Sequence, residues 1–333
     1  MPVRIGVIGV GVMGAEHVRL LSQVVAGSAV CAVFDVDRER AVTVADGCGA
    51  RVFDDPLVLI KDDEVDAVLV ASSDNTHEEF ALACLATGKP VLCEKPLAPD
   101  VEGCVRILQA ESHHGRRLVS VGFMRRYDPG YADLKLALSD GSVGRALMLH
   151  CVHRNAISQG QPSSALISGS AVHEIDIVRW LLDEELASVT VHRARTAEGA
   201  AGTQDPMLLV FSSASGVLID VEVFVNAGYG YEVRCEVVGG HGTVSIDALP
   251  PTVRRAAGQI SRAVPANWRP RFADAYRREL QAWIVGVDSD DHGQFASAWD
   301  GYVATEVAAA GIRALDTGQL ENIELRDKPE LYR

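Results

Sequence analysis

The sequence has 333 residues, of which 48% are hydrophobic and 23% charged, and its formal net charge is −14. A chain of this length is long for a single core, so two domains are expected. The acidic balance argues against nucleic acid and anionic membranes as partners, and the absence of an apolar run of about 18 residues argues against a membrane span.

The first 122 residues alternate short apolar runs with helical patterns. The apolar runs predict buried strands, because the central strands of a parallel sheet are apolar on both faces. A helical segment at Glu78–Thr87 ends at Gly88, which is a suitable helix C-cap. This alternation predicts a doubly wound parallel sheet. The expected strands are Val3–Ile8, Ala29–Phe34, Ala67–Ala71, Val91–Cys93 and Leu118–Val121.

A glycine motif follows the first of these strands and opens a helix. Gly9, Gly11 and Gly14 have the G-x-G-x-x-G spacing, with Val12 and Met13 at the expected helix start. Such a motif permits a tight turn, close approach of a pyrophosphate and close helix–strand packing. Asp35 ends the next strand, where a carboxylate binds both adenosine ribose hydroxyls and repels a 2′-phosphate. The first domain is therefore expected to be a Rossmann domain that binds NAD, although Arg38 and Arg40 leave NADP as an alternative.

After Gly122 the pattern changes to clustered strands flanked by helices. We expect helices at Tyr131–Leu138, Val172–Leu182, Phe272–Val285 and Trp299–Leu315. The strands are expected at Ala146–Arg154, Ala187–Arg195, Met207–Ser212, Val217–Phe224, Tyr231–Val238 and Gly242–Ile246. This order predicts an α+β domain with an open, largely antiparallel sheet. We place the dinucleotide-binding domain at 1–122 and a substrate-binding and oligomerisation domain at 123–333, so the whole chain is of the α/β class.

The seven cysteines are scattered along the chain with no CxxC pair and no Cys/His cluster. Most lie in apolar stretches, so buried reduced thiols are expected rather than a metal site or a disulfide framework. Reduced thiols fit a reducing, cytoplasmic compartment.

Lys95 follows the expected strand Val91–Cys93 and precedes Pro96. Ligands of an open parallel sheet bind beyond the carboxyl ends of its strands. Lys95 is therefore expected near the nicotinamide and the substrate.

At this point the sequence resembles the glucose–fructose oxidoreductase and inositol 2-dehydrogenase (Gfo/Idh/MocA) family over nearly its whole length. The resemblance rests on the glycine motif, on Glu94-Lys95-Pro96 and on His173 within Val-His-Glu-Ile-Asp. Further stretches resemble the inositol dehydrogenase branch in particular, and these are 122–129, 153–155, 229–232, 268–272 and 298–302.

The resemblance implies NAD-dependent oxidation of a secondary hydroxyl on an inositol or related cyclitol. Lys95 would stabilise the developing alkoxide and His173 would accept the hydroxyl proton. Positions implied to bind the substrate are Met124, Arg125, His153, Asn155, Tyr231 and Asp176, the last of which could also orient His173 or cap its helix. Positions implied to bind the cofactor, beyond the glycine motif and Asp35, are Ser72, Ser73, His77, Glu94 and Lys95. A homo-oligomer, dimer or tetramer, is also expected from the resemblance.

One position departs from the family pattern. The family usually carries an acidic residue four positions before the histidine, and here that position is Gly169. The same chemistry on an aminocyclitol or a pyranose therefore remains an alternative. A second alternative is a protein of another functional class, a catalytically weak sensor that binds NAD. The presence of both Lys95 and His173 argues against this alternative.

Overall fold

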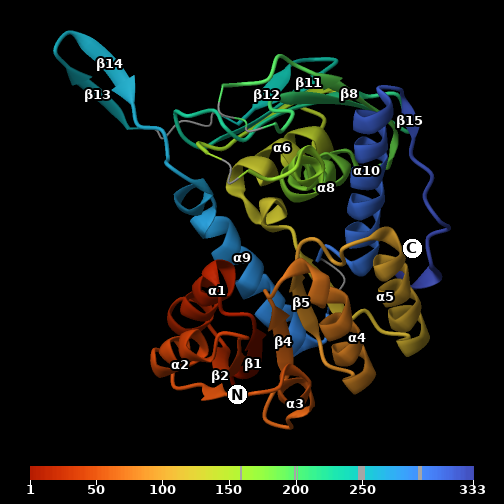
Figure 1. The fold of residues 1–333 in the computed structure, drawn as a ribbon. Coiled ribbons are helices and arrows are strands. Elements are labelled where there is room, and N and C mark those ends of the chain that lie inside the picture. The colour runs from red at the N-terminus through yellow and green to blue at the C-terminus, as the bar shows by residue number, and fades with distance from the viewer. Residues whose placement is uncertain (158–159, 199, 201, 247–251, 292–294) are drawn as a thin grey trace. The chain divides into compact units, whose positions relative to one another are not determined.

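The computed structural model describes residues 1–157, 160–198, 200, 202–246, 252–291 and 295–333. Its residues form two compact units (Figure 1). Unit 1 contains 1–124, 276–305 and 326–333, and unit 2 contains 125–275 and 306–325. The segments 276–305 and 326–333 fall in the second domain predicted from the sequence, whereas in the structure they pack within unit 1.

Unit 1 is built on a six-stranded parallel sheet with the order β3-β2-β1-β4-β5-β6. This is the doubly wound order of a Rossmann domain, as the sequence predicts. The strands are β1 (Val3–Ile8), β2 (Ser28–Phe34), β3 (Arg51–Val52), β4 (Ala67–Val70), β5 (Val91–Glu94) and β6 (Val119–Gly122). Every residue of β4 is buried, because helices cover both faces.

Helices follow each of the first five strands of this sheet. They are α1 (Val12–Gln23), α2 (Arg38–Asp46), α3 (Pro56–Lys61), α4 (His77–Thr87) and α5 (Val101–His114), with a short turn η1 (Asp74–Thr76) before α4. The helices α3, α4 and α5 pack side by side, and α1 packs against the returning helix α9 (Trp268–Ser289), where His17 meets Tyr276 edge to face. Gly88 ends α4 at φ +68°, as expected for a glycine C-cap.

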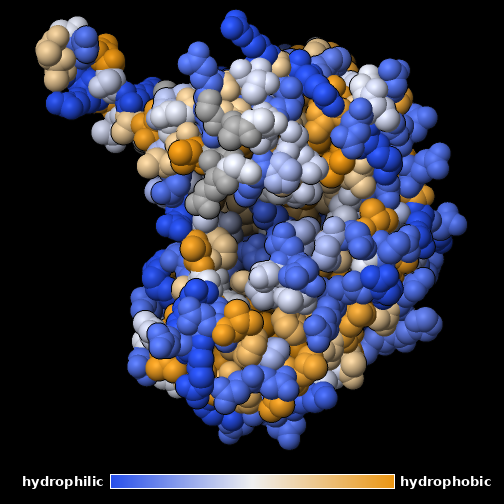
Figure 2. Space-filling model, in the orientation of Figure 1, coloured by the Kyte–Doolittle hydropathy of each residue, from blue (hydrophilic) through white to orange (hydrophobic). Residues whose placement is uncertain are grey.

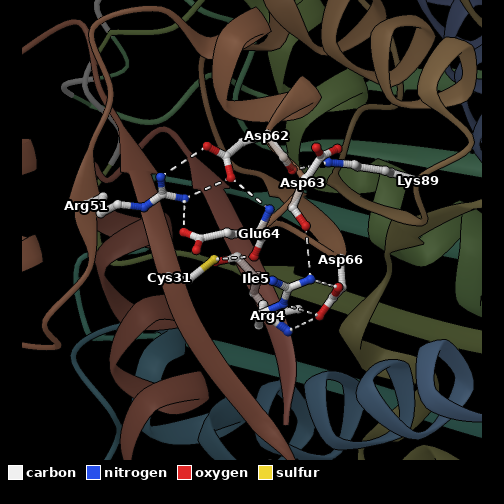
Figure 3. A network of polar contacts seen from close by, with 9 residues as sticks. All are labelled: Arg4, Ile5, Cys31, Arg51, Asp62, Asp63, Glu64, Asp66 and Lys89. Atoms are coloured by element: carbon white, nitrogen blue, oxygen red, sulfur yellow. Dashed lines mark hydrogen bonds and ion pairs between the residues drawn. The ribbon is translucent and has the colours of Figure 1, made fainter. Parts of the chain in front are cut away.

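Charged groups gather at the amino end of this sheet (Figure 3). Arg4 Nε lies 3.0 Å from Asp66 Oδ2, and Arg51 Nη2 lies 2.9 Å from Asp62 Oδ1. Lys89 Nζ donates to the carbonyl of Asp62 at 2.6 Å. These partly exposed pairs fix the turn before β4 and contribute little stability each. They lie at the opposite end from the glycine motif, which follows the carboxyl end of β1.

Unit 2 contains a seven-stranded sheet with the order β12-β11-β7-β10-β9-β8-β15. All neighbours are antiparallel except β7 and β10, so the sheet is largely antiparallel, as predicted. The strands are β7 (Ala146–Arg154), β8 (Leu186–Arg193), β9 (Met207–Ser213), β10 (Leu218–Phe224), β11 (Glu232–Gly239), β12 (Thr243–Ser245) and β15 (Glu321–Asn322). A separate exposed hairpin pairs β13 (Val253–Ala256) with β14 (Gln259–Arg262).

Helices cover one face of this sheet. They are α6 (Pro129–Ser139), α8 (Val172–Leu182) and the part of α10 (Ala298–Thr317) that belongs to unit 2. A short helix α7 (Ser163–Ala165) and a π-helical segment η3 (Leu166–Ala171) lead into α8, and the turns η2 (Met124–Tyr127) and η4 (Glu330–Tyr332) complete the elements. The opposite face of the sheet carries half-exposed side chains in alternation, as seen in β7 and β10. Hydrophilic residues dominate the molecular face drawn in Figure 2, with hydrophobic ones scattered among them.

Candidate functional site

The glycine motif has the geometry of a phosphate-binding turn. Gly9 has φ +84°, and a Cβ there would lie 2.5 Å from the backbone of Ser72. A Cβ on Gly14 would lie 1.8 Å from the carbonyl oxygen of Gly9. A Cβ on Gly11, by contrast, would meet no protein atom within 4 Å. Packing therefore explains Gly9 and Gly14, while Gly11 keeps the space in front of the α1 amino terminus open, as a bound pyrophosphate requires.

Asp35 is buried at the end of β2 and is held by two backbone amides. Its Oδ2 accepts from the amide of Val10 and its Oδ1 from the amide of Asp37, both at 2.8 Å. Arg40 Nη1 lies 3.4 Å from Asp35 Oδ1. The carboxylate is thus fixed beside the glycine turn, where the sequence analysis placed it.

A cavity of about 290 Å³ lies in front of these residues within unit 1. Its lining residues are Gly9, Gly11, Phe34, Asp35, Val36, Arg40, Ala71, Ser72, Ser73, Thr76 and Phe80. The glycines, Asp35, Ser72 and Ser73 were predicted from the sequence, whereas Thr76 and the apolar and aromatic residues were not. Arg40, which entered the sequence analysis only as a reason to keep NADP as an alternative, also lines the cavity. Val36, which lines the cavity, is 94% exposed, and no sequence motif distinguishes it from an ordinary surface residue.

His77 and Glu94 connect neighbouring segments of unit 1. His77 is 1% exposed, with Nδ1 2.7 Å from the carbonyl oxygen of Pro96 and Nε2 3.2 Å from that of Ser72. Glu94 Oε1 lies 2.8 Å from His17 Nε2. Burial raises the pKa of Glu94, but His17 and Lys95 outweigh it and hold that pKa below its usual value. Both residues therefore position the segment that carries Lys95, a half-exposed residue after β5.

A buried cluster of charged side chains lies in unit 2. Arg125 and Glu174 are each 1% exposed and form an ion pair through Arg125 Nη1 and Glu174 Oε1. His153 Nδ1 lies 3.0 Å from Glu174 Oε2 and 3.2 Å from Arg125 Nη2. Burial disfavours the charged carboxylate, yet Arg125 and His153 hold the pKa of Glu174 below its usual value. The cluster therefore carries an ionised pair in contact with an imidazole.

Aromatic rings surround this cluster. The rings of His153 and His173 have centroids 6.5 Å apart, and His153 meets Tyr231 edge to face at 6.0 Å. The Arg125 guanidinium lies over the Phe272 ring at 5.5 Å. Burial raises the pKa of Tyr231 to about 12, so its hydroxyl is protonated at neutral pH. The structure thus brings together four of the residues expected at the substrate site, namely Arg125, His153, His173 and Tyr231.

Other expected residues take different positions. Asp176 is buried in an ion pair with Arg126, whose Nε lies 3.0 Å from Asp176 Oδ2. Met124 is buried. Asn155 follows β7, and its backbone amide donates to the carbonyl oxygen of Phe224. Tyr229 and Tyr231 both precede β11, and Tyr229 is 49% exposed beside Arg154 while Tyr231 is buried.

Gly169 lies in η3, four residues before His173, and is exposed. A Cβ at this position would meet no atom within 4 Å. π-Helical turns occur frequently at functional sites. At the position where this chain departs from the family pattern, the backbone therefore has room for a side chain.

Comparisons with known proteins agree with this arrangement. Residues 3–123 match the profile of the GFO/IDH/MocA oxidoreductase family with an NAD-binding Rossmann fold, and residues 131–245 match the GFO/IDH/MocA C-terminal domain. The chain is 52% identical to inositol 2-dehydrogenase 2 of Saccharopolyspora erythraea, over 100% of this chain and 98% of that protein. It is 44% identical to the inositol 2-dehydrogenase of Klebsiella pneumoniae strain 342, over the full length of both.

A solved structure is also similar over the full length. The myo-inositol dehydrogenase from Lactobacillus casei, in complex with NAD(H) and myo-inositol, matches with a TM-score of 0.96 and 35% identity, over 100% of both chains.

Proposed function

The chain belongs to the GFO/IDH/MocA family of oxidoreductases, and we propose that it oxidises a secondary hydroxyl of a cyclic polyol, an inositol or a close relative, to the ketone with NAD. The observation that carries the proposal is the full-length similarity to inositol 2-dehydrogenases, at 52% identity for the S. erythraea protein. The buried cluster of unit 2 supports it, because a polyol needs several fixed donors and acceptors over a shaped floor.

The residues of unit 1 fit NAD. The glycine turn at Gly9, Gly11 and Gly14, with the first-turn amides of Val12 and Met13, would hold the pyrophosphate. Asp35 retains acceptor capacity for ribose hydroxyls, since each carboxylate oxygen has more than one lone pair. Ser72, Ser73 and His77 would lie beside the nicotinamide ribose, as the resemblance implies, and His77 would hold this segment through its contacts with the carbonyl oxygens of Ser72 and Pro96.

Two residues would carry the proton chemistry. When bound, NAD supplies the acceptor for the hydride of the reacting carbon. Lys95 would donate a hydrogen bond to the reacting oxygen, and His173 would take the hydroxyl proton, because its unperturbed pKa lies near neutrality. Arg125, His153, Asn155, Tyr231 and Met124 would contact the rest of the ring. Asp176 would help to position the site through the ion pair that it forms with Arg126.

Gly169 favours a second candidate substrate class. The open space beside its backbone and the missing carboxylate suit an aminocyclitol or a pyranose as well as an inositol. Without a carboxylate at 169, one acceptor for a substrate hydroxyl is missing, so an amine or a bulkier substituent would be tolerated in place of that hydroxyl.

We further propose that the chain forms a homo-oligomer through the outer face of the seven-stranded sheet. Leu218 of β10 is 42% exposed and alternates with the buried Ile219 and Val221, and its register partner on β7, Met148, is half-buried. An open sheet face with exposed apolar side chains is a typical interface. A cytoplasmic location is proposed because all seven cysteines are free thiols. No helix among the described residues is long and apolar enough to cross a membrane.

The test is a substrate panel with both cofactors. Purified protein is incubated with NAD or NADP and with myo-inositol, other inositol isomers, aminocyclitols and pyranoses, and reduced cofactor is followed by absorbance. We expect the highest kcat/KM with NAD and an inositol. Turnover confined to pyranoses would reject the cyclitol assignment, and cofactor binding without turnover of any polyol would support a sensor instead.

A further inference from the structure

His153 Nδ1 lies between a hydrogen-bond donor and a hydrogen-bond acceptor. Glu174 Oε2 is 3.0 Å away and Arg125 Nη2 is 3.2 Å away. A neutral imidazole nitrogen either carries a proton and donates, or keeps a lone pair and accepts. The neighbour that Nδ1 serves therefore decides which ring nitrogen is protonated, and so what Nε2 offers.

The contacts favour Glu174 as the partner of Nδ1. A carboxylate oxygen only accepts, so an unprotonated Nδ1 would place two lone pairs against each other at 3.0 Å. Arg125 has another acceptor in Glu174 Oε1, and its guanidinium also lies over Phe272. Because Glu174 is 1% exposed, a charge-assisted bond from Nδ1–H to its carboxylate is strong.

We propose that Glu174 is a positioning residue that holds the His153 proton on Nδ1, so that Nε2 is an acceptor for one hydroxyl or ammonium group of the substrate. The substrate part of this inference rests on the proposed function, whereas the protonation pattern of His153 does not. The acceptor would select against any substrate that cannot donate at that position, such as a methyl ether or a fluoro analogue, because a buried polar group would be left unpaired.

The rest of the surroundings hold the ring without competing for Nδ1. Tyr231 meets the His153 ring edge to face at 6.0 Å, and His173 lies 6.5 Å away between ring centroids. His153 itself is 5% exposed at the end of β7. The ring is thus fixed by packing, and Glu174 sets its tautomer in the way a buried carboxylate orients a catalytic histidine.

The tautomer is measured directly in the wild-type protein without substrate. The protein is labelled with ¹⁵N-histidine, and the two ring nitrogens of His153 are identified by the signals that disappear in His153→Gln. We expect a protonated Nδ1 and an unprotonated Nε2. A protonated Nε2 with a bare Nδ1 would overturn the proposal, whatever the enzyme oxidises.

Substitutions then link the tautomer to selectivity. Glu174→Gln offers an amide that can donate to Nδ1, so the proton should move to Nε2 and kcat/KM for myo-inositol should fall about 5- to 150-fold, the cost of one unsatisfied buried polar group. Glu174→Asp keeps the carboxylate and should retain the wild-type tautomer. Glu185→Gln is the matched control, because Glu185 pairs with Arg179, which lies on α8 as Glu174 does. This control should change neither the His153 tautomer nor kcat/KM.

The selectivity is read with myo-inositol analogues that carry a methyl ether or fluorine at one position at a time. We expect wild type to reject the analogue at one non-reacting position, and Glu174→Gln to lose that discrimination. Equal use of all such analogues by wild type would overturn the acceptor role. Oxidation of no cyclitol, with Nδ1 still protonated, would reject the proposed function and leave the role of Glu174 in place.

Discussion

Adding the missing carboxylate, Gly169→Asp, is the sharpest test of how this chain departs from its family. The position lies in the π-helical segment η3, four residues before His173. No protein atom lies within 4 Å of a Cβ built there, so aspartate is accommodated without repacking. Replacing a helical glycine also costs no helix propensity, since aspartate is the better helix former of the two.

The expected electrostatic effect follows from the spacing. Side chains four residues apart on a helix have Cβ atoms about 5–6 Å apart. Two unit charges 6 Å apart interact by about 0.7 kcal/mol in water and about 2.8 kcal/mol at an effective dielectric constant of 20. At 1.36 kcal/mol per pKa unit, the new carboxylate would raise the pKa of His173 by about 0.5–2 units.

The assay is the pH dependence of kcat/KM for myo-inositol with NAD. A base must be neutral to act, so a higher pKa of His173 moves the rising limb of the profile to higher pH by the same amount. We also expect Gly169→Asp to gain on myo-inositol relative to aminocyclitols and pyranoses. Gly240→Asp is the control, because Gly240 is exposed and likewise has no atom near its Cβ.

Two outcomes would refute this reasoning. If Gly169→Asp leaves both the rising limb and the substrate ranking unchanged, residue 169 does not face the reacting groups. If Gly240→Asp moves the limb equally, the shift reflects overall charge and not a local contact.

Three further substitutions test the other parts of the site. Asp35→Ala should lower the ratio of kcat/KM with NAD to kcat/KM with NADP. It should also lower the Tm, because the backbone amides of Val10 and Asp37 lose their acceptor. A wild-type protein that prefers NADP would contradict the role of Asp35. Lys95→Ala should lower kcat by about 10²–10⁴-fold while the Kd for NAD, from fluorescence titration, stays close to wild type; retention of half the turnover would remove Lys95 from the mechanism. Glu174→Gln should lower the free energy of unfolding by about 3–5 kcal/mol at pH 7, because Arg125 loses its buried counter-charge. The pKa of Glu174 is held below its usual value, so this contribution to stability is fully present above the unfolded pKa of about 4.3 and is lost as the pH falls through the lower folded pKa. The difference in Tm between wild type and variant should therefore shrink in acid. A difference in Tm that stays constant with pH would argue against an ionised Glu174.

The Rossmann unit was predictable because its signals are local. β1 begins and ends at the predicted residues, and in unit 2 so do β7 and α8. The motif at Gly9–Gly14 encodes a turn whose steric demands hold in any such fold. The strand β3 was missed because two residues, Arg51 and Val52, carry no period.

The assignment of α9 and α10 to the two units depends on tertiary packing. Both helices are amphipathic and were predicted near their observed bounds. Which unit each segment joins is decided by contacts such as His17 with Tyr276, between residues more than 250 positions apart. Sequence periodicity gives the face of a helix that is buried, but not the element that buries it.

The partners of Glu174 and Asp176 could not be predicted from the sequence. A helix exposed on one side reveals by its period which residues point inward, but α8 is buried on nearly all sides, including Glu174, Asp176 and Arg179. Residues two apart on a helix point in nearly opposite directions, and the two acids accordingly pair with consecutive arginines, Glu174 with Arg125 and Asp176 with Arg126. Exchanging the partners would require α8 to turn by about half a revolution about its axis. The two pairs therefore fix the rotation of α8, and this rotation, rather than the spacing of residues along the chain, puts a carboxylate on His153.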